Sequence, residues 1–163
     1  MKKIVFVRHG RAEDTVSEIT DFERSLTSKG KAISRTMANR YLEKEPDPGL
    51  IITSPAFRAL ETALIFSNEF GIKPEKVIMD SSLYYQTDLN SLFKLLGTIS
   101  EQVNIITLFG HNPAFTQIPD RLCIEGCEFL TKTSIVCISF PVKTWSAVKP
   151  DTGNIEYILK PDK

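Results

Sequence analysis

The chain has few of the residues that build metal centres or disulfide frameworks: two histidines and three cysteines among 163 residues. The odd number of cysteines argues against a framework of paired disulfides. Cys123 and Cys127 are four residues apart, but no histidine lies near them in the sequence to complete a metal site. We interpret them as small buried thiols near a helix end, and we expect neither a metal ion nor another cofactor.

The chain also has no formal net charge at pH 7 and no long apolar runs. Lysine plus arginine and aspartate plus glutamate number 20 each, so no long-range field would attract nucleic acid or an anionic membrane. No segment approaches the roughly 18 apolar residues of a membrane span, and the N-terminal apolar run is too short for a signal peptide. We therefore expect a cytoplasmic, soluble protein without nucleic-acid or membrane partners. Any anion binding must then come from a local cluster of cations.

Strand-like and helix-like segments alternate along the chain. Apolar runs predict strands, helical periodicity marks the segments between them, and a polar stretch, 11–24, reads as a loop over the functional site. Thr27 is predicted to be the N-cap of the first helix. This alternation predicts a single α/β domain over 1–163, with a mostly parallel sheet and helices on both faces. Two late strands, near 134–140 and 155–159, are expected at or near an edge of the sheet.

Each histidine directly follows an apolar run that reads as a buried strand. His9 comes after Ile4–Arg8 and His111 after the run 104–110, while a third run, Leu50–Thr53, leads toward Arg58. In an open parallel sheet, ligand sites lie beyond the carboxyl ends of the strands. We therefore expect Arg8, His9, Arg58 and His111 at one edge, where two guanidinium groups and two imidazoles suit a phosphoryl group.

Two dipeptides, Ser54-Pro55 and Asn112-Pro113, are predicted to start helices directly after strands, with the first residue as N-cap and proline at the first helical position. Their free N–H groups would add positive potential for an anion. The sequence has no glycine-rich phosphate loop, no cysteine-phosphatase loop and no acidic cluster suited to two metals. An imidazole remains as the nucleophile, which predicts metal-independent, two-step transfer through a phosphohistidine.

Three motifs together resemble the histidine phosphatase, or phosphoglycerate-mutase-like, superfamily: Arg8-His9-Gly10, Ser54-Pro55-x-x-Arg58-Ala59-x-x-Thr62 and Gly110-His111-Asn112-Pro113. The short chain, Leu26-Thr27-Ser28-Lys29-Gly30 and Thr133-Ser134-Ile135 are similar to its SixA-type phosphohistidine phosphatase branch. The resemblance implies a phosphoglycerate-mutase-like fold without a large inserted helical subdomain. It also implies His9 as the phosphorylated nucleophile, Arg8 and Arg58 as phosphate ligands, and His111 as a donor that stabilises the transition state. Arg24 is a further candidate substrate contact, and Asn112 is foremost a helix cap with a secondary phosphate contact.

The chain departs from that family in two places. Arg11 stands where many members carry an acidic residue, and the segment 81–88 lacks the glutamate that serves mutase-type members as a general acid. Because a phosphorylated imidazole depends less on an enzyme acid than an alkoxide does, the missing glutamate favours a phosphohistidine-bearing phosphotransfer domain as substrate. The alternatives are a phosphatase of small phosphoesters, with Glu13, Asp14 or Asp88 as the acid, and a non-catalytic phosphoprotein-binding module.

Four further residues are expected to have structural roles. Thr62 is expected to support the pocket, and Trp145, Tyr84 and Tyr85 are expected to be packing residues.

Overall fold

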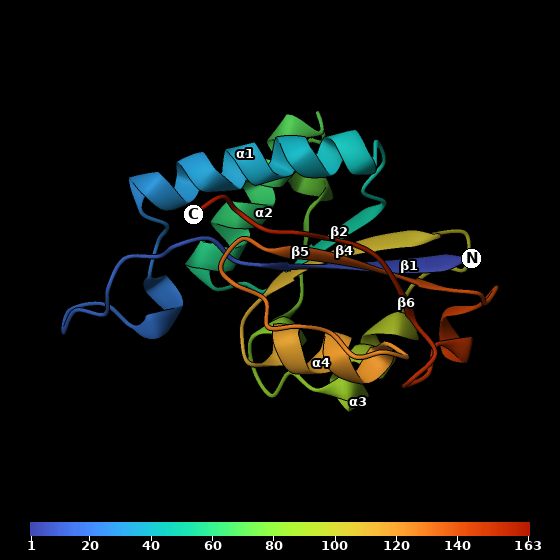
Figure 1. The fold of residues 1–163 in the computed structure, drawn as a ribbon. Coiled ribbons are helices and arrows are strands. Elements are labelled where there is room, and N and C mark those ends of the chain that lie inside the picture. Colours follow the sequence, from blue (N-terminus) through green and yellow to red (C-terminus); the bar gives the residue numbers. More distant parts are fainter.

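The apolar runs form one six-stranded sheet in the computed structural model, which describes residues 1–163 (Figure 1). Its strands lie in the order β3-β2-β4-β1-β5-β6, and β5 alone runs in the opposite direction to the other five. The two late strands thus occupy one side of the sheet, as predicted. The strands are β1 (Lys2–Arg8), β2 (Leu50–Thr53), β3 (Ile78–Met79), β4 (Ile105–Gly110), β5 (Ile135–Phe140) and β6 (Asn154–Leu159).

Helices cover both faces of this sheet, which confirms the predicted α/β class (Figure 1). Helices α1 (Ser28–Lys44) and α2 (Phe57–Glu69) lie on one face, and α3 (Leu89–Leu96) and α4 (Ala114–Leu122) lie on the other. No large helical subdomain interrupts the chain; the remaining helical pieces are 3₁₀ turns of three residues. They are η1 (Asp21–Glu23), η2 (Pro74–Lys76), η3 (Ser81–Leu83) and η4 (Trp145–Ala147).

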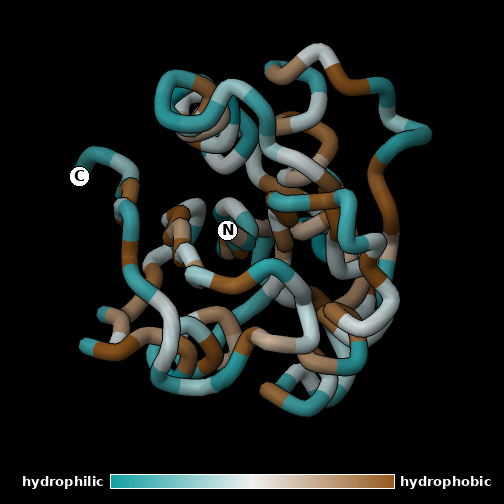
Figure 2. The backbone as a smooth tube through the Cα atoms, turned by 90° about the vertical axis from the view of Figure 1, so that its right-hand side faces the viewer, coloured by the Kyte–Doolittle hydropathy of each residue, from teal (hydrophilic) through white to brown (hydrophobic).

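The central strand β1 is buried on both sides, which is why it reads as an unbroken apolar run. Ile4 and Phe6 belong to the hydrophobic cluster beneath α3 and α4, whereas Val5 and Val7 belong to the cluster beneath α1 and α2. Viewed from the end at which β1 begins, the N-terminus lies near the centre of the molecule (Figure 2). The alternation of side chains along β1 therefore joins the two halves of the core.

The predicted helix starts are correct for α1 but not for the two helices nearest the functional site. Thr27 caps α1, its side chain accepting a hydrogen bond from the Gly30 N–H. Helix α2 begins only at Phe57, and Ser54 instead accepts from the Ala56 N–H. Helix α4 begins at Ala114, so Asn112 is not its N-cap. In both places the strand-to-helix connection is longer than predicted, which leaves the serine and asparagine side chains free for other partners.

Removing the Thr27 cap is expected to destabilise the fold modestly. The variant Thr27→Ala leaves the Gly30 N–H without its side-chain acceptor, at a cost of about 1 kcal/mol in the free energy of unfolding. Urea denaturation measures this loss, and Thr27→Ser, which keeps the hydroxyl, is the matched control. Equal stability of the alanine and serine variants would contradict a capping role.

The cysteines are all free thiols, and Cys123 ends α4 as its C-cap residue. Burial raises the pKa of Cys123 to about 12 and of Cys137 to about 11, which keeps both thiols protonated. Cys127 is only partly buried and lies beyond the helix end. No helix of the protein is both long enough and apolar enough to cross a membrane.

Candidate active site

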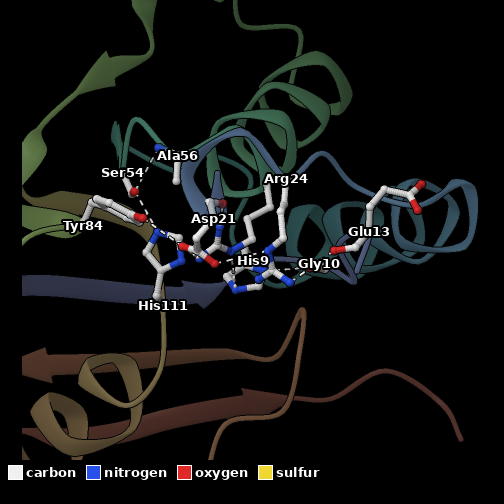
Figure 3. A network of polar contacts seen from close by, with 10 residues as sticks. His9, Gly10, Glu13, Asp21, Arg24, Ser54, Ala56, Tyr84 and His111 are labelled. Atoms are coloured by element: carbon white, nitrogen blue, oxygen red, sulfur yellow. Dashed lines mark hydrogen bonds and ion pairs between the residues drawn. The ribbon is translucent and has the colours of Figure 1, made fainter. Parts of the chain in front are cut away.

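Three parallel strands end level with one another and present the candidate residues at one edge of the sheet. In the register, Arg8 of β1 lies opposite Gly110 of β4, and Thr53 of β2 lies opposite Phe109. The ladder continues one step further, because the His9 N–H donates to Gly110 O and the Ser54 N–H donates to Phe109 O. The next residues on each strand, His9, Ser54 and His111, therefore gather in one place (Figure 3).

The His9 ring is fixed in a single tautomer by its neighbour. Nδ1 lies 2.7 Å from Gly10 O, and because a carbonyl only accepts hydrogen bonds, Nδ1 carries the proton. Nε2 is then unprotonated, and it accepts a hydrogen bond of 3.3 Å from Arg58 Nε. The Gly10 N–H donates to Thr62 Oγ1 at 3.0 Å, which holds this peptide against α2. Thr62 thus supports the pocket, as expected, and the lone pair on Nε2 faces the guanidinium group.

Close backbone packing explains the glycine after His9. A Cβ at Gly10 would lie 2.7 Å from Ser34 Oγ, and a Cβ at Gly30 would lie 2.1 Å from the carbonyl oxygen of Arg11. The segment that follows His9 is therefore pressed onto the first turns of α1. This contact fixes both the His9 backbone and the start of the loop 11–24.

His111 lies beside His9, with 5.0 Å between the ring centroids. Its Nε2 makes a 2.8 Å hydrogen bond with Ser54 Oγ, and its Nδ1 is buried without any partner. The freed serine side chain therefore orients the second imidazole instead of capping α2. When the Ser54 hydroxyl donates to Nε2, Nδ1 carries the proton and is an unused donor.

Both histidines are neutral at physiological pH. Burial and the charges of His111, Arg58 and Arg8 lower the pKa of His9 to about 3. Burial, followed by the charge of Arg58, lowers the pKa of His111 to about 3 as well. A neutral imidazole at His9 has the lone pair that nucleophilic attack requires.

Arg58 is buried, with 6% of its surface exposed, and its guanidinium group holds the carboxylate of Asp21. Nη1 donates to Asp21 O at 2.7 Å and Nη2 donates to Asp21 Oδ2 at 3.0 Å. The Tyr84 hydroxyl donates to the same Oδ2 at 2.8 Å, and Arg24 Nε forms an ion pair with Oδ1 at 3.2 Å. Burial alone would raise the pKa of Asp21, but the hydrogen bonds from Tyr84 and Arg58 hold it below its ordinary value. An ionised carboxylate from the loop therefore occupies the donors next to the histidines (Figure 3).

The structure places Arg8 and Asn112 at the margin of this cluster. Arg8 Nη1 donates to Leu130 O at 3.0 Å, while its Nε is buried and unpartnered. It makes no hydrogen bond to His9 or Arg58, although its charge contributes to the lowered pKa of both histidines. Asn112 also donates to Leu130 O, and its Oδ1 accepts from Thr116 Oγ1. Its side chain therefore ties two protein segments together.

Asp21, Ser54 and Tyr84 are the members of the site that sequence reasoning missed in these roles. Tyr84 was expected to be a packing residue, but it contacts both Asp21 and, edge to face at 5.4 Å, the His111 ring. The acids considered from the sequence lie elsewhere: Asp88 caps α3, and the Glu13 carboxylate points away from the histidines (Figure 3). A signal for Asp21 was available, because it lies three residues before Arg24 in the loop expected over the site.

Acid is expected to destabilise the fold through the two histidines. Unfolded, each has a pKa near 6.5, so between that pH and about 3 the unfolded chain binds more protons than the folded one. Stability therefore falls as the pH falls, by about 2 kcal/mol per histidine between pH 7 and pH 5. Urea unfolding at the two pH values measures the loss, and His111→Asn should reduce it by about 2 kcal/mol. If the free energy of unfolding fell equally in the variant and the parent protein between pH 7 and pH 5, His111 would not be buried in its neutral form.

The sequence of this chain matches a known protein family over its first half. A sequence model of the histidine phosphatase superfamily (branch 1) matches residues 4–83. A protein of Picosynechococcus, itself uncharacterized, is 34% identical over 74 residues, so the match spans 45% of this chain and less than half the length of that relative.

Solved structures extend the likeness to the whole chain. The protein histidine phosphatase SixA in complex with tungstate is 22% identical, with a TM-score of 0.79 over 98% of this chain and 97% of that one. A mycobacterial glucosyl-3-phosphoglycerate phosphatase with inorganic phosphate is 14% identical, with a TM-score of 0.62 over 96% of each chain. The first half of the chain thus matches the histidine phosphatase superfamily, and the fold of the whole chain is of the SixA type.

Proposed function

We propose that this protein is a metal-independent phosphatase that forms a covalent phosphohistidine intermediate on His9. The observation that carries the proposal is the unprotonated Nε2 of His9, which accepts a hydrogen bond from Arg58, both side chains being buried. In the first step Nε2 attacks phosphorus, the N–P bond forms and the bond to the leaving group breaks. In the second step water attacks the same phosphorus, the N–P bond breaks, inorganic phosphate leaves and the imidazole regains its lone pair.

The surrounding donors suit the charge that develops on the transferred phosphoryl group. Arg58 offers Nη1 and Nη2 in the fork geometry that pairs with two phosphoryl oxygens. The unpartnered Nδ1 of His111 is a further donor in the tautomer in which the Ser54 hydroxyl donates to Nε2. These groups are preorganised by buried contacts, so little rearrangement is needed as charge develops.

Substrate binding requires Asp21 to leave its present place. Its carboxylate takes the hydrogen bonds of Arg58 and Tyr84 that an oxyanion would use. The loop around it is the exposed part of the site, and the Asp21 side chain itself is 51% exposed. We therefore propose that the phosphoryl group displaces this carboxylate, with Arg24 and Arg58 exchanging one anion for another.

Phosphohistidine on a phosphotransfer domain is the substrate that we favour. An imidazole leaves as a neutral ring once it is protonated, so its departure depends less on an acid in the enzyme than that of an alkoxide. The chain also lacks an inserted subdomain that would wall off the pocket from a protein surface. The likeness to SixA, a protein histidine phosphatase, supports the same class.

A small phosphoester is the second candidate, and the position of Asp21 favours it. Once displaced from the two arginines, this carboxylate would lose the contacts that hold its pKa down and would face a dianionic phosphoryl group instead. Its pKa would rise, which would let it protonate a leaving oxygen. The fold is also shared with a phosphatase of glucosyl-3-phosphoglycerate.

The deciding experiment compares substrates in the absence of added metal. Turnover of a phosphohistidine-bearing phosphotransfer domain is measured beside p-nitrophenyl phosphate and simple sugar phosphates, with His9→Ala as the control protein. We expect strong preference for phosphohistidine, lost in the control. Preference for an ester, also lost in the control, would keep His9 as the nucleophile and move the assignment to a phosphomonoesterase.

Replacing Asp21 separates the two substrate classes further. If an ester needs Asp21 as its acid, Asp21→Ala lowers kcat for p-nitrophenyl or sugar phosphates by about 100-fold or more. For phosphohistidine we expect kcat to stay within a few-fold and KM to fall, because the variant frees the donors of Arg58. The matched control is Glu18→Ala, an exposed carboxylate of the same loop. A large loss of kcat on phosphohistidine would show that its imidazole also needs Asp21.

A further inference from the structure

A cationic groove lies directly beside the catalytic cluster and takes no part in the mechanism above. It measures about 450 Å³, and four cations line it against a single carboxylate. Its charged members are Arg8, Arg11, Lys29, Lys132 and Asp162. In a chain whose formal charges balance overall, this arrangement concentrates positive potential in one hollow.

These cations are not neutralised within the protein. Arg11, Lys29 and Lys132 are exposed and form no ion pair or side-chain hydrogen bond, and the buried Nε of Arg8 has no partner. The one carboxylate, Asp162, is almost fully exposed and lies 3.8 Å from Arg40 of α1. By contrast, Arg24 and Arg58 in the neighbouring site are already paired with Asp21. The groove is thus open to an anion from outside.

The walls of the groove are fixed relative to His9. Arg8 directly precedes the nucleophile, and the backbone of Arg11 packs against Gly30, next to Lys29. On the other side, the Thr133 N–H donates to Arg8 O at 3.0 Å and to His9 O at 3.2 Å. Thr133 holds a φ of 63°, which a β-branched residue adopts only when its surroundings impose it. An anion bound here would therefore keep a constant position relative to the phosphoryl site.

The lining also favours a peptide over a free ion. Phe129 is 60% exposed, and its ring lies 5.7 Å from the Arg8 guanidinium. With a volume of about 450 Å³, the groove has room for more than one side chain. Cations spread over two walls with an exposed aromatic ring suit a chain that carries more than one carboxylate.

We propose that this groove binds acidic residues that flank the phosphorylated side chain of a protein substrate. The proposal rests on the proposed phosphatase function and names the part of the substrate that selects this enzyme. Arg8 would link the groove to the phosphoryl site, since it directly precedes His9 in the chain and lines the groove. Arg11 stands at the position at which many family members carry an acid, so the charge here favours an acidic neighbour in the substrate.

The test uses two peptides that carry the same phosphohistidine and differ only in four flanking glutamates, replaced by glutamines in the second. The parent protein should show a higher kcat/KM for the glutamate peptide. The charge-reversed variant Arg11→Glu/Lys29→Glu/Lys132→Glu should lower that value roughly tenfold. It should lower the value for the glutamine peptide, whose only anion is the phosphoryl group, far less. The matched control is Lys73→Glu/Lys76→Glu, two exposed lysines near η2 at the far edge of the sheet. Equal turnover of both peptides by the parent protein would overturn the proposal.

Direct binding distinguishes failure of the groove from failure of the phosphatase assignment. Fluorescence anisotropy of the labelled, unphosphorylated glutamate peptide reports on the groove whether or not phosphohistidine is hydrolysed. Binding that is lost in the charge-reversed variant but kept in the lysine control supports the groove. If citrate or inorganic phosphate binds there and the peptide does not, the groove holds small anions and the proposal is wrong. Far-UV circular dichroism verifies that each variant is folded.

Discussion

Replacing His9 with alanine is expected to abolish turnover of every phosphorylated substrate. The variant removes Nε2, the unprotonated nitrogen that accepts a hydrogen bond from Arg58 Nε. Loss of a covalent nucleophile lowers kcat on the order of 10⁶-fold in a comparable hydrolase. The measurement is single-turnover release of phosphate from a phosphohistidine protein.

The same variant separates an enzyme from a phosphoprotein-binding module. Arg58, Arg24 and His111 remain in His9→Ala, so binding of tungstate or inorganic phosphate should persist. In the parent protein, a rapid alkaline quench should trap the phosphoryl group on His9, and acid should release it. A parent protein that binds phosphoprotein but never becomes labelled would identify a module without catalysis.

The second large effect is expected from Arg58. Its alanine variant removes the donors Nη1 and Nη2 and the hydrogen bond from Nε to His9. Loss of a comparable oxyanion donor costs about 2.7–4 kcal/mol, which lowers kcat/KM about 100- to 1,000-fold. Steady-state kinetics with a phosphohistidine substrate measures the change. Near-parental turnover would remove Arg58 from the reacting centre.

Two further variants show whether charge or geometry matters at this position. Arg58→Lys keeps the positive charge but not the planar fork, so we expect only part of the lost rate to return. Arg35→Ala removes an exposed arginine that pairs with Glu69 on the surface, and it should leave kcat/KM unchanged. A full recovery in Arg58→Lys would mean that the site needs a point charge and not paired donors.

Much of the architecture can be predicted from the sequence, because buried parallel strands appear there as continuous apolar runs. The two histidines follow such runs directly, and ligand sites lie beyond the carboxyl ends of parallel strands, so their position could be predicted as well. The helix starts near the site were misplaced for a local reason. Serine before proline usually caps a helix, but Ser54 instead follows the strand ladder one residue further and binds His111. The preference of Ser-Pro for helix starts contains no information about His111, which is distant in the sequence and takes the Ser54 hydroxyl as its hydrogen-bond partner.

The contacts of Asp21 and Tyr84 were beyond prediction from the sequence for a different reason. Asp21 lies in a loop without hydrophobic periodicity. Tyr84 directly follows the 3₁₀ turn η3 and is 63 residues from Asp21 in the sequence. No hydrophobic period fixes the path of either segment, so only the folded chain shows that their side chains meet at Arg58. Arg8 was placed in the right region, but its turn toward Leu130 depends on a loop without periodicity.

The level ends of β1, β2 and β4 have a consequence for how such a protein can diversify. Neighbouring strands lie about 4.8 Å apart because of their hydrogen bonds, and the two imidazoles, on adjacent strands, are 5.0 Å apart. The peptide backbone sets this spacing, so insertions and substitutions in the surrounding loops leave it intact. Lineages can therefore exchange one phosphorylated target for another by altering loops alone, while the chemistry at the strand ends is inherited unchanged.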